Sequence, residues 1–566
     1  MTNAVPDEVG EPGAGELYFL PLGGTGEIGM NLNLYGHDGR WLMVDLGITF
    51  ADAGAPGFEI LMADPDFIVE RRDRLAGLVL THAHEDHIGA VPYLWPRLRC
   101  PIYATKFTAN LVRGKLAEVG WEDQAEIIEV PLSGRFAVGP FEIQLITLTH
   151  SIPEPNALVI RTSAGTVLHT GDWKLDPDPV IGDSYDEAAL RALADEGVLA
   201  MVCDSTNALV PGVAGSEAAV RANLERLIGG LENRVAVTCF ATNVARLDSV
   251  CRAAAAHGRR VALVGRSLHR IHLAATESGF LSDLPPLIDA QDAGYLPRGG
   301  VLLLCTGSQG ESRGALWRIA RNEHPDVALE AGDAVIFSSR VIPGNEVAIH
   351  ALQNSLVEQG IAVYTDRDEP VHVSGHPARD ELTQMYQWVR PRIAVPVHGE
   401  ARHLAGQAQV ARDCQVPEVL VGGNGTLMRL APGPAEIVGE VRSGRLVLDG
   451  IRLLPSDSEL LRERTRLRFN GAALVTLVVD EQGRALDDPR ITFEGVLDPE
   501  SEVEIAEDAR AALSENLARQ PAHVRRDDEA LGEAIRVALR RHIFNAVGKK
   551  PVTRVHVVRL GKAAGP

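Results

Sequence analysis

The sequence predicts an α/β protein in which one layered domain is interrupted by a second α/β domain and followed by a small third one. Three observations lead to this prediction. Short apolar runs alternate with turns and a few helices up to about residue 210. Between about residues 217 and 355 the pattern changes to a regular alternation of strands and helices. Strand features like those of the first part then resume with EPVHVSGH and RIAVPVHGE, so the first domain is completed after the insertion.

The N-terminal region contains a glycine-rich turn between strands. The segment ELYFLPLGGTGEIGMNLNLYGHDGRWLMVDLG alternates apolar and polar residues, which is typical of successive β-strands. Gly24, Gly26 and Gly29 match the dinucleotide-binding pattern GxGxxG. That pattern must open a helix, whereas the next residues, MNLNLYG, continue as a strand, so we expect no dinucleotide site. Residues 1–16 before this segment are acidic and Gly-rich, and we expect them to form a disordered tail.

The insertion and the C-terminal part contain the most regular patterns. In the insertion, RVAVTCF, RRVALVG, GVLLLCTGSQ and AVIFSSR predict strands, and NVARLDSVCRAAAAHG predicts a helix. The C-terminal part contains the strands ALVTLVVDE, RITFEGVL and TRVHVVRL and two helical stretches. The resulting boundaries are 1–16 for the tail, 17–215 and 369–454 for the interrupted first domain, 216–368 for the insertion, 455–468 for a linker and 469–566 for the C-terminal domain.

Composition excludes several classes of protein. A chain of 566 residues is too long for one hydrophobic core. It contains no apolar run long enough to span a membrane and no signal-peptide pattern, so we expect a cytoplasmic protein. Its six cysteines form no CxxC pair and are expected to be reduced core residues. The net charge of −21 argues against nucleic-acid binding by overall charge, although arginines between 259 and 321 leave a local basic groove possible.

The stretch LTHAHEDHIGA concentrates residues that bind metals. His82 and His84 follow the buried strand GLVL and, two apart in extended chain, point to the same side, where they can hold one ion. Asp86 and His87 follow where the chain turns towards a helix, so they are directed at a second point nearby. Four ligands this close suit two ions better than one, because a catalytic zinc site uses about three protein ligands and keeps a position open.

Several other apolar strands end in a histidine or an aspartate. Ligands in layered α/β proteins gather beyond strand carboxyl ends, so these residues are expected to converge on the edge where His82 lies. A carboxylate between two ions offsets their repulsion, and Asp172 is the candidate bridge. Asp45 is better placed to orient a ligand imidazole. The strand ends concerned are Asp45 in WLMVDLG, His150 in IQLITLTHS, Asp172 in TVLHTGDWK, Asp204 in LAMVCDST and His398 in RIAVPVHGE.

These motifs resemble those of a known fold family. HAHEDH, LTHS and HTGDWK are similar, in this order, to the metal-binding motifs of the metallo-β-lactamase fold, an αββα sandwich. DST at Asp204, SGHP at His376 and PVHGE at His398 resemble the motifs of its β-CASP subgroup, nucleases that act on RNA or DNA. LGGTGEIGMN, FATNVARL, GRSL, TGSQGE, IPGNE and HVSGH are similar to the bacterial ribonuclease J family, densely from about residue 17 to 460 and more weakly beyond it.

The resemblance implies a metal-dependent ribonuclease of RNA decay and maturation, a 5'→3' exonuclease that favours 5'-monophosphate ends and also an endonuclease. Two divalent ions, zinc or possibly manganese, would act as Lewis acids and activate a water. His376 would protonate the leaving 3'-oxygen and Asp204 would orient it, with Asp86 and Asp45 as further catalytic residues. The resemblance gives one ion to His82, His84 and His150 and the other to Asp86, His87 and His398, with Asp172 shared.

A phosphate pocket and the partners are implied in the same way. His372, Ser374 and the backbone amides around Gly375, beside His376, could cradle a 5'-phosphate. The expected partners are single-stranded RNA with a 5'-monophosphate, further copies of the chain in a homodimer or tetramer, and an RNA-degradation assembly. The remaining RNA contacts are assigned to Arg266, Ser338, Ser339 and Arg340, of which Arg340 stands where the family more often has a small residue.

Three alternatives stay open at this stage. A DNA nuclease of the β-CASP subgroup is one, because the sequence shows no contact to a 2'-hydroxyl. A small-molecule metallo-hydrolase is another, although a domain inserted between Asp172 and His398 argues against it because such enzymes leave their site open. A non-catalytic scaffold in an RNA-degradation assembly is the third, and the presence of all ligands together with Asp204 and His376 argues against it.

Overall fold

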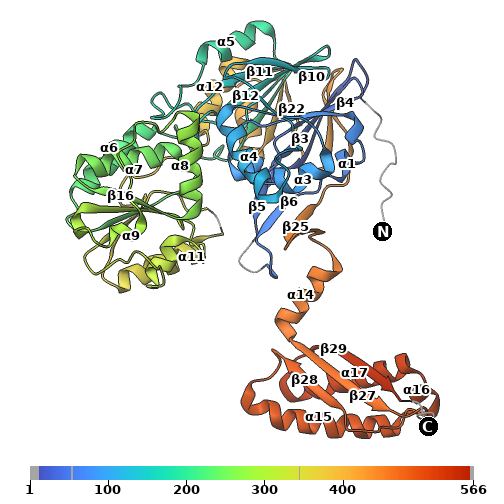
Figure 1. Ribbon diagram of the computed structural model, residues 1–566. Helices are drawn as coiled ribbons and strands as arrows, with labels where there is room; N and C mark the ends of the chain where they lie inside the picture. Colours follow the sequence, from blue (N-terminus) through green and yellow to red (C-terminus); the bar gives the residue numbers. More distant parts are fainter. Residues whose placement is uncertain (1–11, 52–54, 343, 561–566) are drawn as a thin grey trace. The chain divides into compact units, whose positions relative to one another are not determined.

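The computed structural model describes residues 12–51, 55–342 and 344–560 (Figure 1). The predicted α/β class is confirmed. The chain forms two compact units, one of residues 1–52 and 60–446 and one of residues 53–59 and 447–566. Residues 1–11 of the predicted tail lie outside the described residues. Residues 12–16 are ordered by hydrogen bonds, because the amides of Asp38 and Gly39 donate to the carbonyls of Gly13 and Pro12.

Two β-sheets pack face to face in the interrupted domain. Leu17, Phe19 and Val44 of the first sheet share one buried apolar cluster with Ile143 and Val395 of the second. The first sheet has the order β24 (Glu436–Glu440), β23 (Thr426–Ala431), β1 (Leu17–Gly23), β3 (Leu32–His37), β4 (Arg40–Val44), β7 (Leu75–Val79), β8 (Ile102–Ala104) and β9 (Ile127–Glu129). The second has the order β10 (Arg135–Val138), β11 (Phe141–Thr147), β12 (Asn156–Thr162), β13 (Gly165–His169), β14 (Ala200–Asp204), β20 (Ile393–Val397) and β22 (Glu418–Val419).

Helices cover the outer faces of both sheets, which completes the predicted αββα sandwich. On the second sheet, Leu168 and Met201 pack against Leu193, Trp388 and Val410 of three different helices. On the first sheet, α4 packs against β8 and β9. The helices are α1 (Asp66–Val69), α2 (Glu85–Ile88), α3 (Val91–Leu98), α4 (Lys106–Val119), α5 (Glu187–Glu196), α12 (Arg379–Val389) and α13 (Ala401–Asp413), and short strands β2 (Thr25–Gly26), β5 (Ile48–Phe50), β6 (Ile60–Ala63) and β21 (Gly399–Glu400) complete this part.

The insertion is a parallel five-stranded sheet between helices. Its order is β16 (Arg260–Val264), β17 (Val301–Cys305), β15 (Val235–Thr238), β18 (Ala334–Phe337) and β19 (Ala362–Tyr364), so the four predicted strands are present and β19 is additional. Figure 1 shows α6 and α7 on one side of this sheet and α9 and α11 on the other. Its helices are α6 (Glu217–Gly229), α7 (Val244–Ala256), α8 (Arg266–Ser278), α9 (Ala290–Ala293), α10 (Ala315–Ala320) and α11 (Glu346–Glu358).

A buried ion pair ties together the two places where the chain crosses between sandwich and insertion. Glu217 begins α6 at the outgoing crossing, and its carboxylate accepts from the fully buried Arg246 guanidinium at 3.1 Å. Arg246 also donates to the carbonyl of Val371, on the returning segment, and to the carbonyl and hydroxyl of Ser338. Removing one partner of such a pair would leave an unpaired buried charge, which costs about 3–5 kcal/mol.

The second unit contains a three-stranded sheet with two long helices. The described strand order is β28 (Arg490–Glu494), β27 (Ala472–Val479) and β29 (Val552–Arg559), and α15 (Pro499–Arg519) and α17 (Asp528–Val547) share its apolar core. The other elements are β25 (Arg445–Asp449), which the unit boundary divides, β26 (Arg452–Pro455), α14 (Glu459–Asn470) and α16 (Ala522–Arg526). The stretch predicted as a linker therefore contains most of α14.

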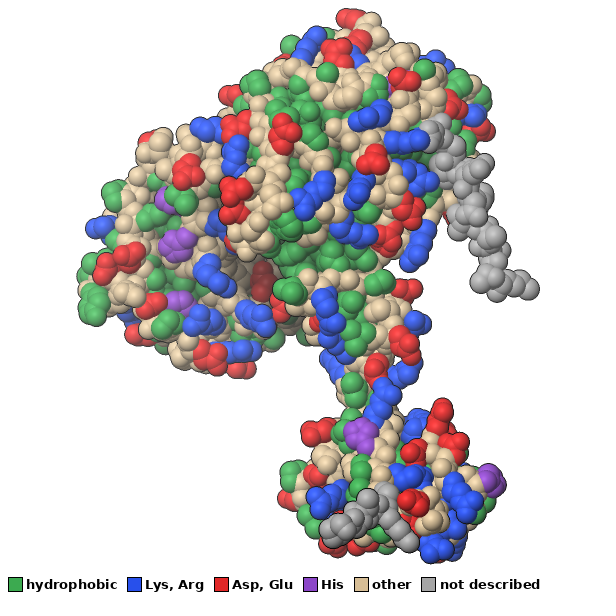
Figure 2. Space-filling model, turned by 45° about the vertical axis from the view of Figure 1, so that its right-hand side comes forward, with side chains coloured by type: hydrophobic (Ala, Val, Ile, Leu, Met, Phe, Trp, Pro, Cys, Tyr) green, Lys and Arg blue, Asp and Glu red, His purple; other side chains and the backbone are tan. Residues whose placement is uncertain are grey.

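Acidic residues are not gathered in one region of the visible surface (Figure 2), and the cysteines form no disulfide bonds. Acidic and basic side chains are interspersed over the face shown in Figure 2. Among the arginines considered for a basic groove, Arg259 is buried against the carbonyls of Leu231 and Asn233 and Arg270 pairs with Glu118. All six cysteines are free, and all except the half-buried Cys414 are buried. In the described part of the chain, no helix is both long and apolar enough to cross a membrane.

Candidate metal centre

Strand ends from both sheets converge on one edge of the sandwich. Asp45 follows β4, the histidine-rich stretch follows β7, and His398 follows β20. Asp45 and His398 both adopt left-handed backbone conformations, with φ of 62° and 51°, so each strand stops sharply where its side chain is needed. Such conformations cost on the order of 1–3 kcal/mol in a non-glycine residue and cluster at functional sites. The sheet packing therefore assembles the predicted strand-end residues into one site.

His82, His84 and His150 form the first group of candidate ligands. Nδ1 of His84 lies 3.1 Å from Nε2 of His82 and 3.0 Å from Nε2 of His150. Nδ1 of His82 contacts the Thr81 hydroxyl at 3.0 Å, and Nδ1 of His150 contacts the Gly375 carbonyl. In both residues Nδ1 carries the proton and donates it in this hydrogen bond. The Nε2 atoms of His82 and His150 therefore carry lone pairs that point towards His84. Converging lone pairs repel one another unless a cation lies between them, and a divalent metal therefore fits this group.

Asp86, His87 and His398 form the second group, and Asp172 is shared by both groups. Oδ2 of Asp172 lies 3.2 Å from Nε2 of His87 and 3.4 Å from Nε2 of His398. The same oxygen lies 3.9 Å from Nε2 of His82 and of His150. Within each group, one ligand atom per residue and an oxygen of Asp172 all lie within 4.8 Å of one another. The geometry thus suits two ions with a carboxylate between them.

Hydrogen bonds outside the ligand atoms orient the second group. Oδ2 of Asp45 accepts from Nδ1 of His87 at 2.7 Å, which leaves Nε2 of His87 as the ligand atom. Oδ1 of Asn31 accepts from Nδ1 of His398 at 3.0 Å. Nε2 of His398 is buried and has no hydrogen-bond partner among the described residues, as a metal ligand requires. Sequence reasoning anticipated the position of Asp45 but missed Asn31 and Thr81, whose residue types carry no metal signal.

The two groups differ in their electrostatics. Burial lowers the pKa of His82 and His150 well below the usual range and that of His84 to about 4. These imidazoles are therefore neutral, which is the form that binds metals. Burial also opposes the charged form of His87, but the carboxylates of Asp172, Asp86 and Asp45 outweigh it and raise its pKa. Burial likewise opposes the charge of Asp172, and nearby imidazoles outweigh it and lower its pKa.

Asp204 and His376 form a hydrogen-bonded pair beside the metal groups. Nδ1 of His376 donates to Oδ2 of the buried Asp204 at 2.8 Å, and the His376 ring stacks on that of His398 with centroids 5.5 Å apart. Burial lowers the pKa of His376, but the charges of Asp204 and Asp172 outweigh it and raise the pKa to about 9. Asp172, Asp204, His376 and His398 are also close enough to hold an ion, but the bond to Asp204 already occupies Nδ1 of His376.

The side chain of Asn207 connects several of the predicted phosphate contacts by hydrogen bonds. Its amide donates to the Ser374 hydroxyl at 2.7 Å and to the His376 carbonyl at 3.2 Å, and its oxygen accepts from Arg340 at 3.3 Å. Gly375 leaves no room for a side chain, because a Cβ there would lie 2.6 Å from the His150 ring.

The other predicted phosphate contacts differ in whether their polar atoms are already hydrogen-bonded within the protein. The Ser338 hydroxyl is bonded to Arg246 and to the Val371 carbonyl, and Ser339 is buried. Nδ1 of the largely buried His372 has no hydrogen-bond partner among the described residues. Within the described ranges, Arg266 at the start of α8 makes no hydrogen bond to this set. His372 therefore keeps a buried ring nitrogen that no described neighbour satisfies.

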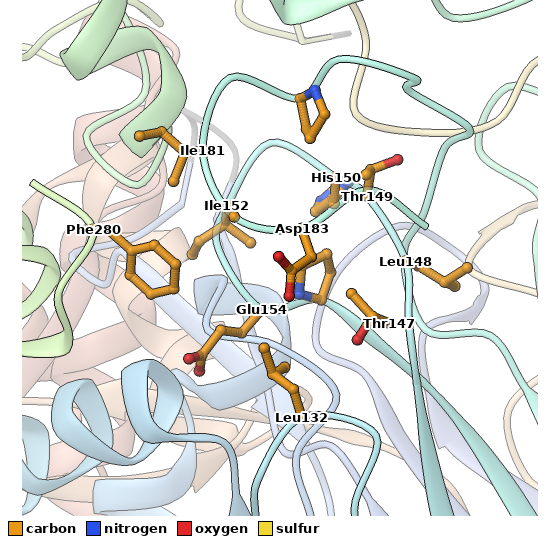
Figure 3. Close-up of a pocket in the computed structure, with 13 residues that line it drawn as sticks. Leu132, Thr147, Leu148, Thr149, His150, Ile152, Glu154, Ile181, Asp183 and Phe280 are labelled. Carbon is orange, nitrogen blue, oxygen red and sulfur yellow. The ribbon is translucent and has the colours of Figure 1, made fainter. Parts of the chain in front are cut away.

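A small pocket of about 90 Å³ adjoins His150 (Figure 3). Ile152, Ile181 and Phe280 form an apolar wall, and the carboxylates of Glu154 and Asp183 lie beside it. None of the 13 residues that line it is lysine or arginine, so this side of His150 offers no cation for a phosphate. Arg340, which contacts Asn207, is not among the residues that line this pocket.

Comparisons with known families define the class of this protein. Family models match the metallo-beta-lactamase superfamily over residues 29–214, the ribonuclease J beta-CASP domain over 232–356, the Zn-dependent metallo-hydrolase RNA specificity domain over 347–417 and the ribonuclease J C-terminal domain over 459–560. The fold and the site are those of a β-CASP metallo-hydrolase that binds divalent metal.

Individual relatives narrow the class to one family. The chain is 45% identical to ribonuclease J from Sinorhizobium meliloti over 551 residues, which cover 96% of this chain and 98% of that protein. It is 38% identical to ribonuclease J from Thermus thermophilus over 82% of each chain. The protein belongs to the ribonuclease J family. A solved structure from Enterococcus faecalis, a protein of unknown function, shares the fold with a TM-score of 0.51 and 15% identity, covering 73% of this chain and 100% of that one.

Proposed function

We propose that the protein is a metal-dependent ribonuclease that removes nucleotides in the 5'→3' direction from 5'-monophosphorylated RNA and also cleaves RNA internally. The observation that carries this proposal is the pair of ligand groups that share Asp172, with the Asp204–His376 pair beside them. Two divalent ions bound there supply Lewis acidity and a water nucleophile near neutral pH, which suits hydrolysis of a phosphodiester. Membership of the ribonuclease J family supports RNA as the substrate.

The residues of the site have separate roles in this proposal. His82, His84 and His150 would hold one ion and Asp86, His87 and His398 the other, with Asp172 close enough to serve both. His376 donates a proton to the leaving 3'-oxygen, since its ring lies beside that of His398 and Asp204 keeps it protonated and oriented. The nitrogen and oxygen donors suit zinc and also accept manganese.

The register of exonuclease cleavage would come from an anion pocket beside the metals. Arg340 supplies a positive charge there, held near Ser374 through Asn207. Burial lowers the pKa of His372, and the nearby charges of Arg246 and Arg340 lower it further. Arg246 is paired with Glu217, so the charge that would attract an added phosphate is that of Arg340. The cytoplasmic location, the homodimer or tetramer and the RNA-degradation assembly stay predictions.

The test is cleavage of one end-labelled single strand, prepared as RNA and as DNA, with a 5'-monophosphate or a 5'-triphosphate. Reactions contain the full chain with zinc, manganese or a chelator. Stepwise, metal-dependent loss that prefers 5'-monophosphorylated RNA is the expected result. Equal cutting of DNA would replace the proposal with a DNA nuclease, and no cutting of either strand would overturn it.

Two histidine variants separate catalysis from binding. His376→Ala should abolish cleavage while retained metal content and unfolding temperature show that the site is intact. His350→Ala is the matched control, because His350 is an exposed residue of α11. Full activity of His376→Ala would show that the proton comes from another group.

A further inference from the structure

The glycine-rich turn that resembles a dinucleotide motif lies against the metal centre. Its glycines Gly24, Gly26 and Gly29 all have positive φ, of 81°, 87° and 93°. The amide of His398 donates to the Gly24 carbonyl at 2.8 Å, and β2 within the turn pairs with β21, which directly follows His398. This turn therefore borders the segment that supplies a ligand of the second group.

Gly24 leaves space that a neighbouring side chain fills. A Cβ at Gly24 would lie 2.1 Å from Oδ1 of Asn31, which is closer than any two such atoms can approach. At Gly26, by contrast, no atom lies within 4 Å of an added Cβ. The absence of a side chain at Gly24 thus allows the buried amide of Asn31 to reach the metal centre.

Asn31 contacts three candidate ligands at once, and its Nδ2 lies 3.1 Å from Nε2 of His87. Its backbone amide and its Nδ2 donate to the Asp86 carbonyl at 2.9 and 3.0 Å. Its Oδ1 accepts from Nδ1 of His398 at 3.0 Å. With the proton fixed on Nδ1, Nε2 of His398 carries a lone pair directed at the second ion position, and the buried Nε2 has no protein partner among the described residues.

We propose that Asn31 is a positioning residue for the second metal position, where it sets the tautomer and the ring orientation of His398 as Asp45 does for His87. This inference rests on the metal-binding role proposed above. The Asn31 amide accepts a hydrogen bond without adding charge, whereas Asp45 already contributes a carboxylate to the same group. Gly24 is required because it gives the Asn31 side chain its place.

The experiment measures metal binding to the metal-free full chain. Manganese is titrated calorimetrically, and the ions retained per chain after dialysis are counted by atomic emission. Wild type should bind two ions. In Asn31→Ala the ion of the second group should lose roughly 10–100-fold in affinity, while the ion of the first group changes by less than about threefold. Asn31→Asp keeps an oxygen that accepts from His398 and should restore most of that affinity.

Two control variants exclude general damage to the fold. Asn33→Ala removes another buried asparagine, in β3, whose Oδ1 has no hydrogen-bond partner in the described chain, and should leave both ions in place. Gly24→Ala should weaken the second ion, because its Cβ displaces the Asn31 amide. Gly26→Ala carries the same backbone strain without a contact and should bind both ions.

Several outcomes would overturn the inference. Unchanged affinities in Asn31→Ala would remove Asn31 from the metal centre. An Asn31→Asp variant as weak as Asn31→Ala would show that the bond to the Asp86 carbonyl, and not the one to His398, is what matters. Because the measurement needs no RNA, two bound ions without ribonuclease activity would refute the proposed function and leave this inference standing.

Discussion

The first and second ligand groups differ in what orients their imidazoles. In the first group the partners are the Thr81 hydroxyl and the backbone carbonyl of Gly375. In the second group they are the side chains of Asp45 and Asn31. A backbone carbonyl cannot be removed by a substitution, whereas a carboxylate or an amide can. The second group is thus oriented by side chains alone, whereas the first depends on the Thr81 hydroxyl and on how the segment around Gly375 packs.

The same contrast appears in the charge around each group. Neutral imidazoles surround one another in the first group, and burial lowers their pKa values. Carboxylates surround the second group, where they raise the pKa of His87. A cation at the first group relieves lone-pair repulsion, whereas a cation at the second is also attracted by negative charge. We infer that the groups lose their ions independently, and the following variants test this.

Removal of Asp172 should break both groups and have the largest effect. Asp172→Ala takes away the oxygen that faces the imidazoles of both. Metal content should fall below one ion per chain, and RNA cleavage should fall by about 10³-fold or more, because each ion contributes several kcal/mol of charge stabilisation. Asp195→Ala, at an exposed position of α5, is the control. Retention of two ions in Asp172→Ala would refute the shared bridge.

Removal of one ligand should break a single group. His84→Ala should abolish the ion of the first group and His398→Ala that of the second, and each variant should keep one ion per chain by atomic emission. Cleavage should fall on the order of 10²-fold or more in both, because phosphodiester hydrolysis uses both ions. Loss of both ions in either variant would show that the groups are coupled, which would contradict the inference that they lose their ions independently.

Asp45→Asn should weaken only the second group. The amide that replaces the carboxylate can still accept from Nδ1 of His87 but contributes no charge. The affinity for the ion of the second group should fall roughly 10–100-fold, and calorimetric titration should show an unchanged affinity for the ion of the first group. Equal weakening of both ions would mean that the Asp45 bonds to Thr81, which also contacts His82, dominate.

Gly375→Ala should disturb the first group and have the smallest effect. The new Cβ would lie 2.6 Å from the His150 ring, so the ring or the segment must move. The affinity of the first ion should fall roughly tenfold, because His150 keeps its ligand atom but loses its alignment. Gly439→Ala, at a position with no atom within 4 Å of an added Cβ, should behave as wild type. An unchanged affinity for the ion of the first group would show that the backbone around Gly375 can shift without displacing the His150 ring.

Local sequence patterns anticipated much of the fold. The parallel strands of the insertion and its helix α7 follow directly from apolar runs and from a 3.6-residue period. The strand β19 was missed, because it has only three residues and these are partly exposed, so they form no long apolar run. The linker prediction overlooked α14, whose polar residues give little amphipathic contrast.

The site was anticipated where residue type reveals chemistry and missed where it does not. His82, His84 and Asp172 carry the donors that metals prefer, and the structure brings them together. Asn31 carries an ordinary amide in a strand-forming segment, so nothing local distinguishes it from Asn33. Only its contacts with Asp86, His87 and His398, which are far away in the sequence, point to the role proposed for Asn31.

By itself, the sequence determined the α/β class, the interrupted domain order and the candidate metal-binding side chains, because strand and helix periods and donor atoms are properties of short segments. The tertiary structure decided which nitrogen of each histidine faces the site and which neighbour holds the other nitrogen. It also decided that Gly375 packs on His150 and that Gly24 makes room for Asn31. The Gly24–Asn31 contact is local, but the contacts of Asn31 with His398 and of Gly375 with His150 join segments distant along the chain and exist only in the folded domain.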